Sequence, residues 1–235
     1  MTIDSRTQVS LSSRILHAAG HDDLVWGHAS VRDPEGRGIW IKSAGWALGE
    51  VTPERVHLVD ADGELVEGEG TPHSECAIHS EIMAARDDVG AVVHTHPPHA
   101  VALAASGQEL RPVSHAANMF VPPAVPRFTR TADLILTREL GAAVAATLGD
   151  ARALFLVNHG IVTVGRDIRE ATVAAVILEN ACRQQILTHT AGGWPTWSVE
   201  QESLAKRGHI YHDAAIESVW NHLVRDLPEQ SGTKR

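Results

Sequence analysis

Apolar residues recur along the chain in two periods, one typical of strands and one typical of helices. Short apolar runs predict strands at 38–42, 56–60, 89–93, 153–157 and 161–164. Apolar positions three or four residues apart predict a helix at 7–19 and a long helix that opens at Asp167 and ends before Gly192. Further helices are expected at 72–86, 99–105 and 133–148, and one helix or a pair of helices at 199–225.

Turn residues show how these elements are joined. Asp62-Gly63 separates the strand at 56–60 from an extended segment at 64–67, which is a hairpin signal. The stretch 107–131 is rich in proline and irregular, and such a long loop is usually functional or ordered by a partner. Helices interleaved with strands and hairpins predict an α/β fold with a mixed sheet covered by helices. With 235 residues, the chain is expected to form a single domain over 1–235, with a disordered polar tail after about 227.

Composition and charge exclude several classes of partner. The net charge of −9 argues against nucleic-acid binding, because phosphates require a basic surface. No apolar stretch approaches the roughly 20 residues of a membrane helix, and no signal peptide is expected at the N-terminus. The two cysteines give no disulfide framework and suit a reducing compartment, so a cytoplasmic location is expected.

Three of the 15 histidines stand at the ends of apolar runs. His94 and His96 close the run 89–93, and side chains two residues apart on a strand point to the same face. His159 follows the run 153–157, and a third imidazole from a neighbouring strand end would complete a three-histidine metal site with an open position. On spacing alone, this interpretation and a purely structural role for the histidines remain equally open.

Glu75 is expected in the first turn of the helix at 72–86, 19 residues before His94. A carboxylate beside a Lewis-acidic cation can shuttle protons, and His79, one turn later, would orient it. The alternative is a solvated glutamate that is favoured at a helix start by the helix dipole.

The ordered set Ser74-Glu75, His79, Ala91-Val92-Val93-His94-Thr95-His96 and Asn158-His159-Gly160 resembles the class II aldolase/adducin family. The resemblance implies a three-layer α/β/α fold with a central mixed, largely antiparallel sheet. It implies one divalent metal ion per subunit (Zn, Mn, Fe or Co) on His94, His96 and His159, with Glu75 as the acid/base carboxylate. It also implies a homo-oligomer, commonly a homotetramer, with active sites at subunit interfaces.

Three segments distinguish branches within this family. Sugar-phosphate aldolases hold phosphate with Gly-Asn-x-Ser, a Ser-Gly loop and Ser-Ser-Glu, whereas this chain has Gly27-His28-Ala29-Ser30, Ser43-Ala44-Gly45 and His73-Ser74-Glu75. The loop 112–116 keeps a family histidine, His115, but lacks the tyrosine that follows in sugar-phosphate aldolases. The segment 27–32 is instead similar to the decarboxylase branch, whose members act on 3,4-dihydroxyphthalate or on a hydroxypyridine dicarboxylate from vitamin B6 breakdown.

The resemblance therefore predicts a metal-dependent decarboxylase of a hydroxylated aromatic (di)carboxylic acid in aromatic catabolism. Glu75 is the expected proton donor, with His28 or His115 as the alternative, and a C-terminal tyrosine, Tyr211, is a further catalytic candidate. Trp46, Met119 and Phe120 are candidates for apolar walls, with a role as core or interface residues as the alternative. The residues expected to bind the substrate carboxylates are His28, Ser30, Ser43, His73 and Ser74.

Three other functions remain as alternatives. A sugar-phosphate aldolase or epimerase would need the phosphate pocket, which is incomplete here. A non-enzymatic, adducin-like interaction module would lack the metal histidines, which this chain keeps. An oxygen-using enzyme or a broader lyase on the same metal site is not distinguished by sequence.

Overall fold

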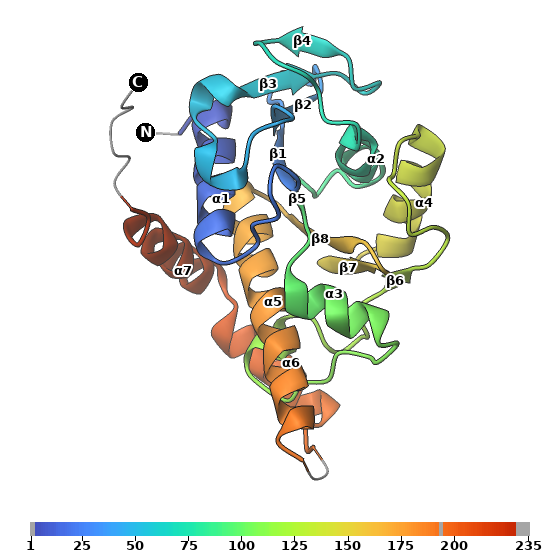
Figure 1. Cartoon of the computed structure of the whole chain (residues 1–235). Coiled ribbons are helices and arrows are strands. Elements are labelled where there is room, and N and C mark those ends of the chain that lie inside the picture. Colours follow the sequence, from blue (N-terminus) through green and yellow to red (C-terminus); the bar gives the residue numbers. More distant parts are fainter. Residues whose placement is uncertain (1–2, 193–194, 229–235) are drawn as a thin grey trace.

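A mixed β-sheet runs through the middle of the molecule, and helices cover both of its faces (Figure 1). This computed structural model describes residues 3–192 and 195–228. The three layers confirm the α/β/α class expected from the sequence.

The described residues form eight strands in the order β4-β3-β2-β1-β5-β8-β7-β6. Every neighbouring pair is antiparallel except β6 and β7, so the sheet is largely antiparallel as expected. The strands are β1 (His28–Arg32), β2 (Ile39–Lys42), β3 (Val56–Val59), β4 (Leu65–Glu67), β5 (Ala91–Thr95), β6 (Arg127–Phe128), β7 (Ala153–Leu156) and β8 (Gly160–Gly165).

The helices divide between the two faces. The long helix α5 packs with α1, α3 and α7 on one side, while α2 and α4 pack together on the other (Figure 1). The helices are α1 (Ser5–Ala18), α2 (Cys76–Ala85), α3 (Pro98–Ala105), α4 (Arg138–Leu148), α5 (Ile168–Thr190), α6 (Glu200–Ile210) and α7 (Asp213–Arg225). Short 3-10 helices lie at η1 (Leu48–Glu50), η2 (Pro53–Arg55) and η3 (Ala116–Met119). No helix among the described residues is both long and apolar enough to cross a bilayer.

Alternation along the strands separates two buried cores. Phe155 and Ile161 face the core under α1 and α5, whereas Leu154 and Val162 face the core under α2 and α4. On β5, Val92 belongs to the second core, and His94, two residues later, is on the same face of the strand. The candidate site therefore lies at the ends of strands on the α2 side of the sheet.

Two helices begin later than the sequence pattern predicts. The helix expected from Pro72 begins at Cys76, so Glu75 is its N-cap residue and not part of its first turn. The helix expected from Asp133 begins at Arg138, because the Thr137 hydroxyl accepts a hydrogen bond from the Leu140 amide and caps it there. The region 199–225 is a pair of helices, and the irregular 107–131 stretch contains η3 and β6. Of the tail after 227, only Pro228 lies within the described residues, so the expected disorder concerns residues outside them.

Candidate metal centre

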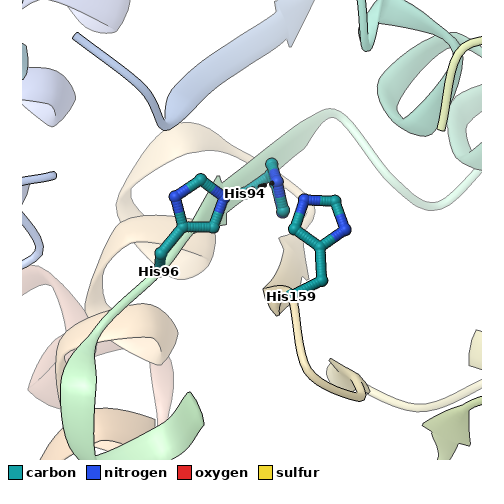
Figure 2. A group of neighbouring side chains, drawn as sticks. All are labelled: His94, His96 and His159. Atoms are coloured by element: carbon teal, nitrogen blue, oxygen red, sulfur yellow. Dashed lines mark hydrogen bonds between the residues drawn. The ribbon is translucent and has the colours of Figure 1, made fainter. Parts of the chain in front are cut away.

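The pairing of three central strands brings His94, His96 and His159 together. β5 lies between β1 and β8, and Thr95 is paired with Ile161, so the turn that precedes β8 comes beside the end of β5. Asn158 adopts the left-handed conformation at this turn, with φ of 61°. Figure 2 shows the three imidazoles converging from the β5 end and from the β7–β8 turn. One nitrogen from each ring lies within 4.8 Å of the others.

Hydrogen bonds fix which ring nitrogen of His94 and of His96 is available. His94 Nδ1 lies 2.9 Å from the Ile161 carbonyl oxygen, and His96 Nδ1 lies 2.8 Å from an Asp23 carboxylate oxygen. Because a carbonyl and a carboxylate oxygen only accept, both Nδ1 atoms carry the hydrogen and both Nε2 atoms present lone pairs. The two Nε2 atoms face each other at 3.2 Å. Two lone pairs at this distance repel unless a cation lies beside them.

His159 supports the same conclusion. Both of its ring nitrogens are buried and have no hydrogen-bond partner among the described residues. Such an orphaned polar group is costly unless something outside the chain satisfies it. Burial, followed in importance by neighbouring His94, lowers the pKa of His96 to about 4, so this ring is neutral at neutral pH, as a metal ligand must be. Three converging imidazoles fit a divalent ion such as Zn, Mn, Fe or Co.

Gly160 allows these rings to approach one another. A Cβ at this position would lie 2.6 Å from His96 Cδ2, 2.6 Å from the Thr95 carbonyl oxygen and 3.2 Å from His94 Cε1. The backbone conformation of Gly160 is not left-handed, so its lack of a side chain, and not its flexibility, is what the site requires.

Glu75 lies against the same imidazoles. Its carboxylate oxygens are 3.7 Å from His94 Nε2 and 3.6 Å from His159 Nε2, and one of them accepts a hydrogen bond of 2.8 Å from the Ile135 amide. Burial alone raises the pKa of Glu75, but the neighbouring His159 and His94 rings and the hydrogen bond from the Ile135 amide outweigh it and hold the pKa well below its ordinary value. The carboxylate is therefore ionised beside the three histidines.

Three more imidazoles form a second layer behind this group. His28 is paired directly opposite His94 across β1 and β5, and its ring centroid lies 5.0 Å from that of His94 and 4.2 Å from that of His73. His28 Nδ1 lies 2.6 Å from His79 Nε2, and His79 Nδ1 lies 2.7 Å from the Ser30 hydroxyl oxygen. Burial and the neighbouring histidines lower the pKa of His28 and of His79 well below the ordinary value, so both rings are neutral.

The expectation that His79 orients Glu75 is wrong. Both ring nitrogens of His79 are occupied by His28 and Ser30. The physical reason is that β1, which carries both His28 and Ser30, lies beside His79 and takes up both of its ring nitrogens.

A second group, His28, Glu75 and His94, also has ligand atoms within 4.8 Å of one another. It cannot hold an ion at the same time as the three histidines, because His94 has only one free nitrogen once Nδ1 donates to Ile161. His28 and Glu75 are therefore the side chains of this second group that face an ion or substrate bound at the three histidines.

The residues expected to bind the substrate carboxylates differ in how deeply they are buried. Ser43 is buried and its hydroxyl lies 3.5 Å from the Thr71 carbonyl oxygen, next to the segment that carries His73. His73 is half-buried, and its buried Nε2 has no partner in the described chain. Ser74 is exposed, whereas Ser30 is fully buried.

His115 and Tyr211 lie together but apart from these residues. The Tyr211 hydroxyl donates to the His115 carbonyl oxygen at 2.8 Å, and neither side chain hydrogen-bonds to the histidine cluster within the described residues. Met119 and Phe120 are buried in the core under α5, which agrees with the alternative that they are core residues. Trp46 is partly exposed, with the Arg55 guanidinium 3.5 Å from its ring centroid.

Two residues near the histidine cluster could not be predicted from local sequence patterns. Asp23 contacts His96 across 73 positions of sequence. Lys42 is completely buried, and its ammonium donates to the carbonyl oxygens of Val25 at 2.9 Å and Trp46 at 2.6 Å. Burial lowers the pKa of Lys42 to about 8. An isolated Asp in a loop and a Lys on a strand carry no pattern that would identify either.

Comparison with known proteins places these residues in a family context. Residues 7–186 match the model of the class II aldolase and adducin N-terminal domain. The chain is 30% identical to the 3,4-dihydroxyphthalate decarboxylase of Rhodococcus jostii (strain RHA1), over 94% of each chain. It is 34% identical to the 5-deoxy-D-ribulose 1-phosphate aldolase of Bacillus thuringiensis serovar kurstaki, over 88% of this chain and 96% of the relative.

Solved structures give the same architecture. The L-fuculose 1-phosphate aldolase from Glaciozyma antarctica PI12 matches 94% of this chain and 87% of its own, with a TM-score of 0.83 and 26% identity. The similar proteins thus include a decarboxylase and two aldolases.

Proposed function

This chain belongs to the class II aldolase and adducin family of enzymes, and from that premise we propose that it is a metal-dependent decarboxylase of a hydroxylated aromatic (di)carboxylic acid. A lyase reaction is common to the similar decarboxylases and aldolases, so the proposal concerns which carbon–carbon bond is broken. A substrate such as 3,4-dihydroxyphthalate would bind with adjacent oxygens toward His94, His96 and His159.

The observation that carries the proposal is the imidazole wall formed by His28 and His73 against His94. Burial lowers the pKa of His73 to about 3 and that of His28 well below its ordinary value, so both offer neutral N–H donors. Neutral donors suit a carboxylate, whereas a phosphate dianion calls for several charged or strong donors. Planar imidazoles also provide surfaces against which an aromatic ring can stack.

The remaining donors near the wall are poorly placed for a phosphate group. The Ser30 hydroxyl is fully buried against His79, and the Lys42 ammonium is held by two backbone carbonyls. We therefore assign Ser30 to the support of His79, and His28, His73 and Ser43 to the substrate carboxylates, with Ser74 at the exposed edge. Identity alone does not separate the two activities, since the aldolase relative is the more similar of the two.

Glu75 is the residue that we expect to move the proton. Its lowered pKa leaves it ionised before substrate arrives, so it first accepts the proton of a phenolic hydroxyl. It then delivers that proton to the ring carbon that bears the carboxylate, and that carbon becomes tetrahedral. The carbon–carboxylate bond breaks, CO2 leaves, and the bonding electrons restore the aromatic ring, while Glu75 returns to its ionised form. A divalent ion on the three histidines would act as a Lewis acid toward the substrate oxygens.

Because Glu75 is ionised in the free protein, we prefer a mechanism in which it takes a proton from the substrate and returns it to the ring carbon. In the other mechanism, Glu75 would already carry the proton before the substrate binds. His28 lies beside Glu75 and is the alternative donor at this position. His115 and Tyr211 contact each other and form no hydrogen bond with the histidine cluster among the described residues, so we propose that they act at the site of a neighbouring copy in a homo-oligomer.

The test begins with purified protein supplied with Mn2+, Zn2+, Co2+ or Fe2+ and assayed for CO2 release from 3,4-dihydroxyphthalate and related hydroxyaromatic acids. Cleavage of ketose 1-phosphates is measured in parallel. Release of CO2 supports the proposal, whereas cleavage of a ketose 1-phosphate with no turnover of any hydroxyaromatic acid would refute it.

A variant of Glu75 then tests its role. Glu75→Gln is expected to keep metal and fold but to lose about 10²- to 10⁴-fold in turnover, the usual contribution of general acid–base catalysis. Glu81→Gln is the matched control, because Glu81 lies on α2 and pairs with Arg138 at the surface. Undiminished activity of Glu75→Gln would rule Glu75 out as the proton carrier.

A further inference from the structure

The outer hydrogen-bond partners of His94, on β5, and of His96, just past its end, differ in kind. His94 Nδ1 donates to a backbone carbonyl, whereas His96 Nδ1 donates to the side chain of Asp23. A carboxylate behind a ligating histidine fixes the ring orientation and raises its basicity. We propose that Asp23 is a positioning residue that holds His96 for metal binding, and this inference rests on the metal site of the proposed function.

The loop that carries Asp23 is attached to the sheet at several points. His21 Nδ1 lies 2.9 Å from the Thr95 hydroxyl oxygen, on the residue between His94 and His96. The Lys42 ammonium donates to the Val25 carbonyl oxygen at 2.9 Å. The Trp26 amide donates to the Asp23 carbonyl oxygen at 2.9 Å, which closes a turn that begins at Asp23. Asp23 is therefore held in place by its own loop and not by the contact with His96 alone.

Backbone conformation shows that this arrangement is specific. Leu24, next to Asp23, has φ of 50°, a left-handed conformation that is uncommon for a residue with a branched side chain. Gly27 has φ of 76°, and a Cβ there would lie 3.4 Å from Thr95 Cγ2 and 3.5 Å from the His94 carbonyl oxygen. The loop thus turns tightly against the end of β5, where it brings the carboxylate to 2.8 Å from His96 Nδ1.

The neighbouring residue provides a matched comparison. Asp22 lies on the same loop and carries the same charge, but it pairs with His17 Nδ1 on α1 at 3.0 Å. Both carboxylates are partly exposed, so a general effect of loop charge would be the same for both. Of these two loop carboxylates, Asp23 alone contacts a residue of the three-histidine group.

The experiment compares the Zn2+ affinity of the full chain, Asp23→Asn and Asp22→Asn by competition with a chromophoric chelator. Asp23→Asn is expected to bind Zn2+ about 10- to 100-fold more weakly, the range found when outer partners of metal ligands are removed. Asp22→Asn is expected to match the unmodified chain. Asp23→Ala, which removes every acceptor, is expected to lose at least as much affinity as Asp23→Asn.

Two further readouts keep the outcomes separate. The visible absorption of bound Co2+ reports the ligand set directly and is expected to change in Asp23→Asn but not in Asp22→Asn. Equal Zn2+ affinity and equal Co2+ spectra for the two variants would overturn the role of Asp23. Failure of the unmodified chain to bind either ion would instead overturn the metal site on which the proposed function rests.

Discussion

Adding one methyl group at Gly160 is expected to disturb the three-histidine group without removing any ligand. The Cβ of Gly160→Ala would lie 2.6 Å from both His96 Cδ2 and the Thr95 carbonyl oxygen. Carbon atoms in favourable contact are about 3.5–4.0 Å apart, so each contact must open by roughly 1 Å. Thr95 is a backbone contact inside the sheet and cannot turn aside, so the His96 ring or the start of β8 must move.

The magnitude follows from this overlap. Forcing extra volume into a packed interior costs about 1–3 kcal/mol, so the metal-free variant is expected to lose free energy of unfolding in that range. Displacement of His96 and His94 should also weaken metal binding, and each 1.4 kcal/mol lost corresponds to about a tenfold change in affinity. A decrease of about tenfold or more in Zn2+ affinity is therefore expected.

The measurements are urea unfolding of the metal-free protein and Zn2+ competition, with Gly208→Ala as the control. Gly208 is exposed on α6 and a Cβ there meets no heavy atom within 4 Å. Gly208→Ala should leave metal affinity unchanged and raise the free energy of unfolding by about 0.5–1 kcal/mol, because alanine favours a helix more than glycine does. A Gly160→Ala variant with unchanged stability and unchanged Zn2+ affinity would refute the packing argument.

Two other predictions concern the residues behind the site. For Lys42, whose pKa is lowered to about 8 by burial, the unfolded chain binds more protons than the folded chain above that pH. The free energy of unfolding of the unmodified protein should therefore rise relative to that of Lys42→Met between about pH 8 and about pH 10.4, the ordinary pKa of lysine. Urea titrations across this range measure the difference, and parallel stability curves for the two proteins would contradict the prediction. His79→Ala should remove the support of His28 and lower kcat on the aromatic acid without loss of Zn2+ affinity. His79→Gln, which can still hydrogen-bond, should recover part of kcat. Equal kcat values for both variants and the unmodified enzyme would refute the role of His79.

The fold followed closely from patterns that are local in the sequence. Short apolar runs and 3–4 spacings depend on residues that are neighbours along the chain, so the strands with Val92 and Leu154 and the helix opened by Asp167 could be predicted. Helix starts were predicted less well. The late starts of α2 and α4 depend on a cap and on the path of the preceding loop, neither of which changes the apolar period.

The sequence by itself determined that His94 and His96 share one face of a strand and that His159 stands at another strand end, because side-chain alternation is a property of the backbone. Only the tertiary structure decided that β5 lies between β1 and β8. That pairing sets His28 opposite His94 and brings Asp23 to His96, from segments that are dozens of residues away in sequence. Strand order and register are set by burial over the whole sheet, which no local pattern encodes.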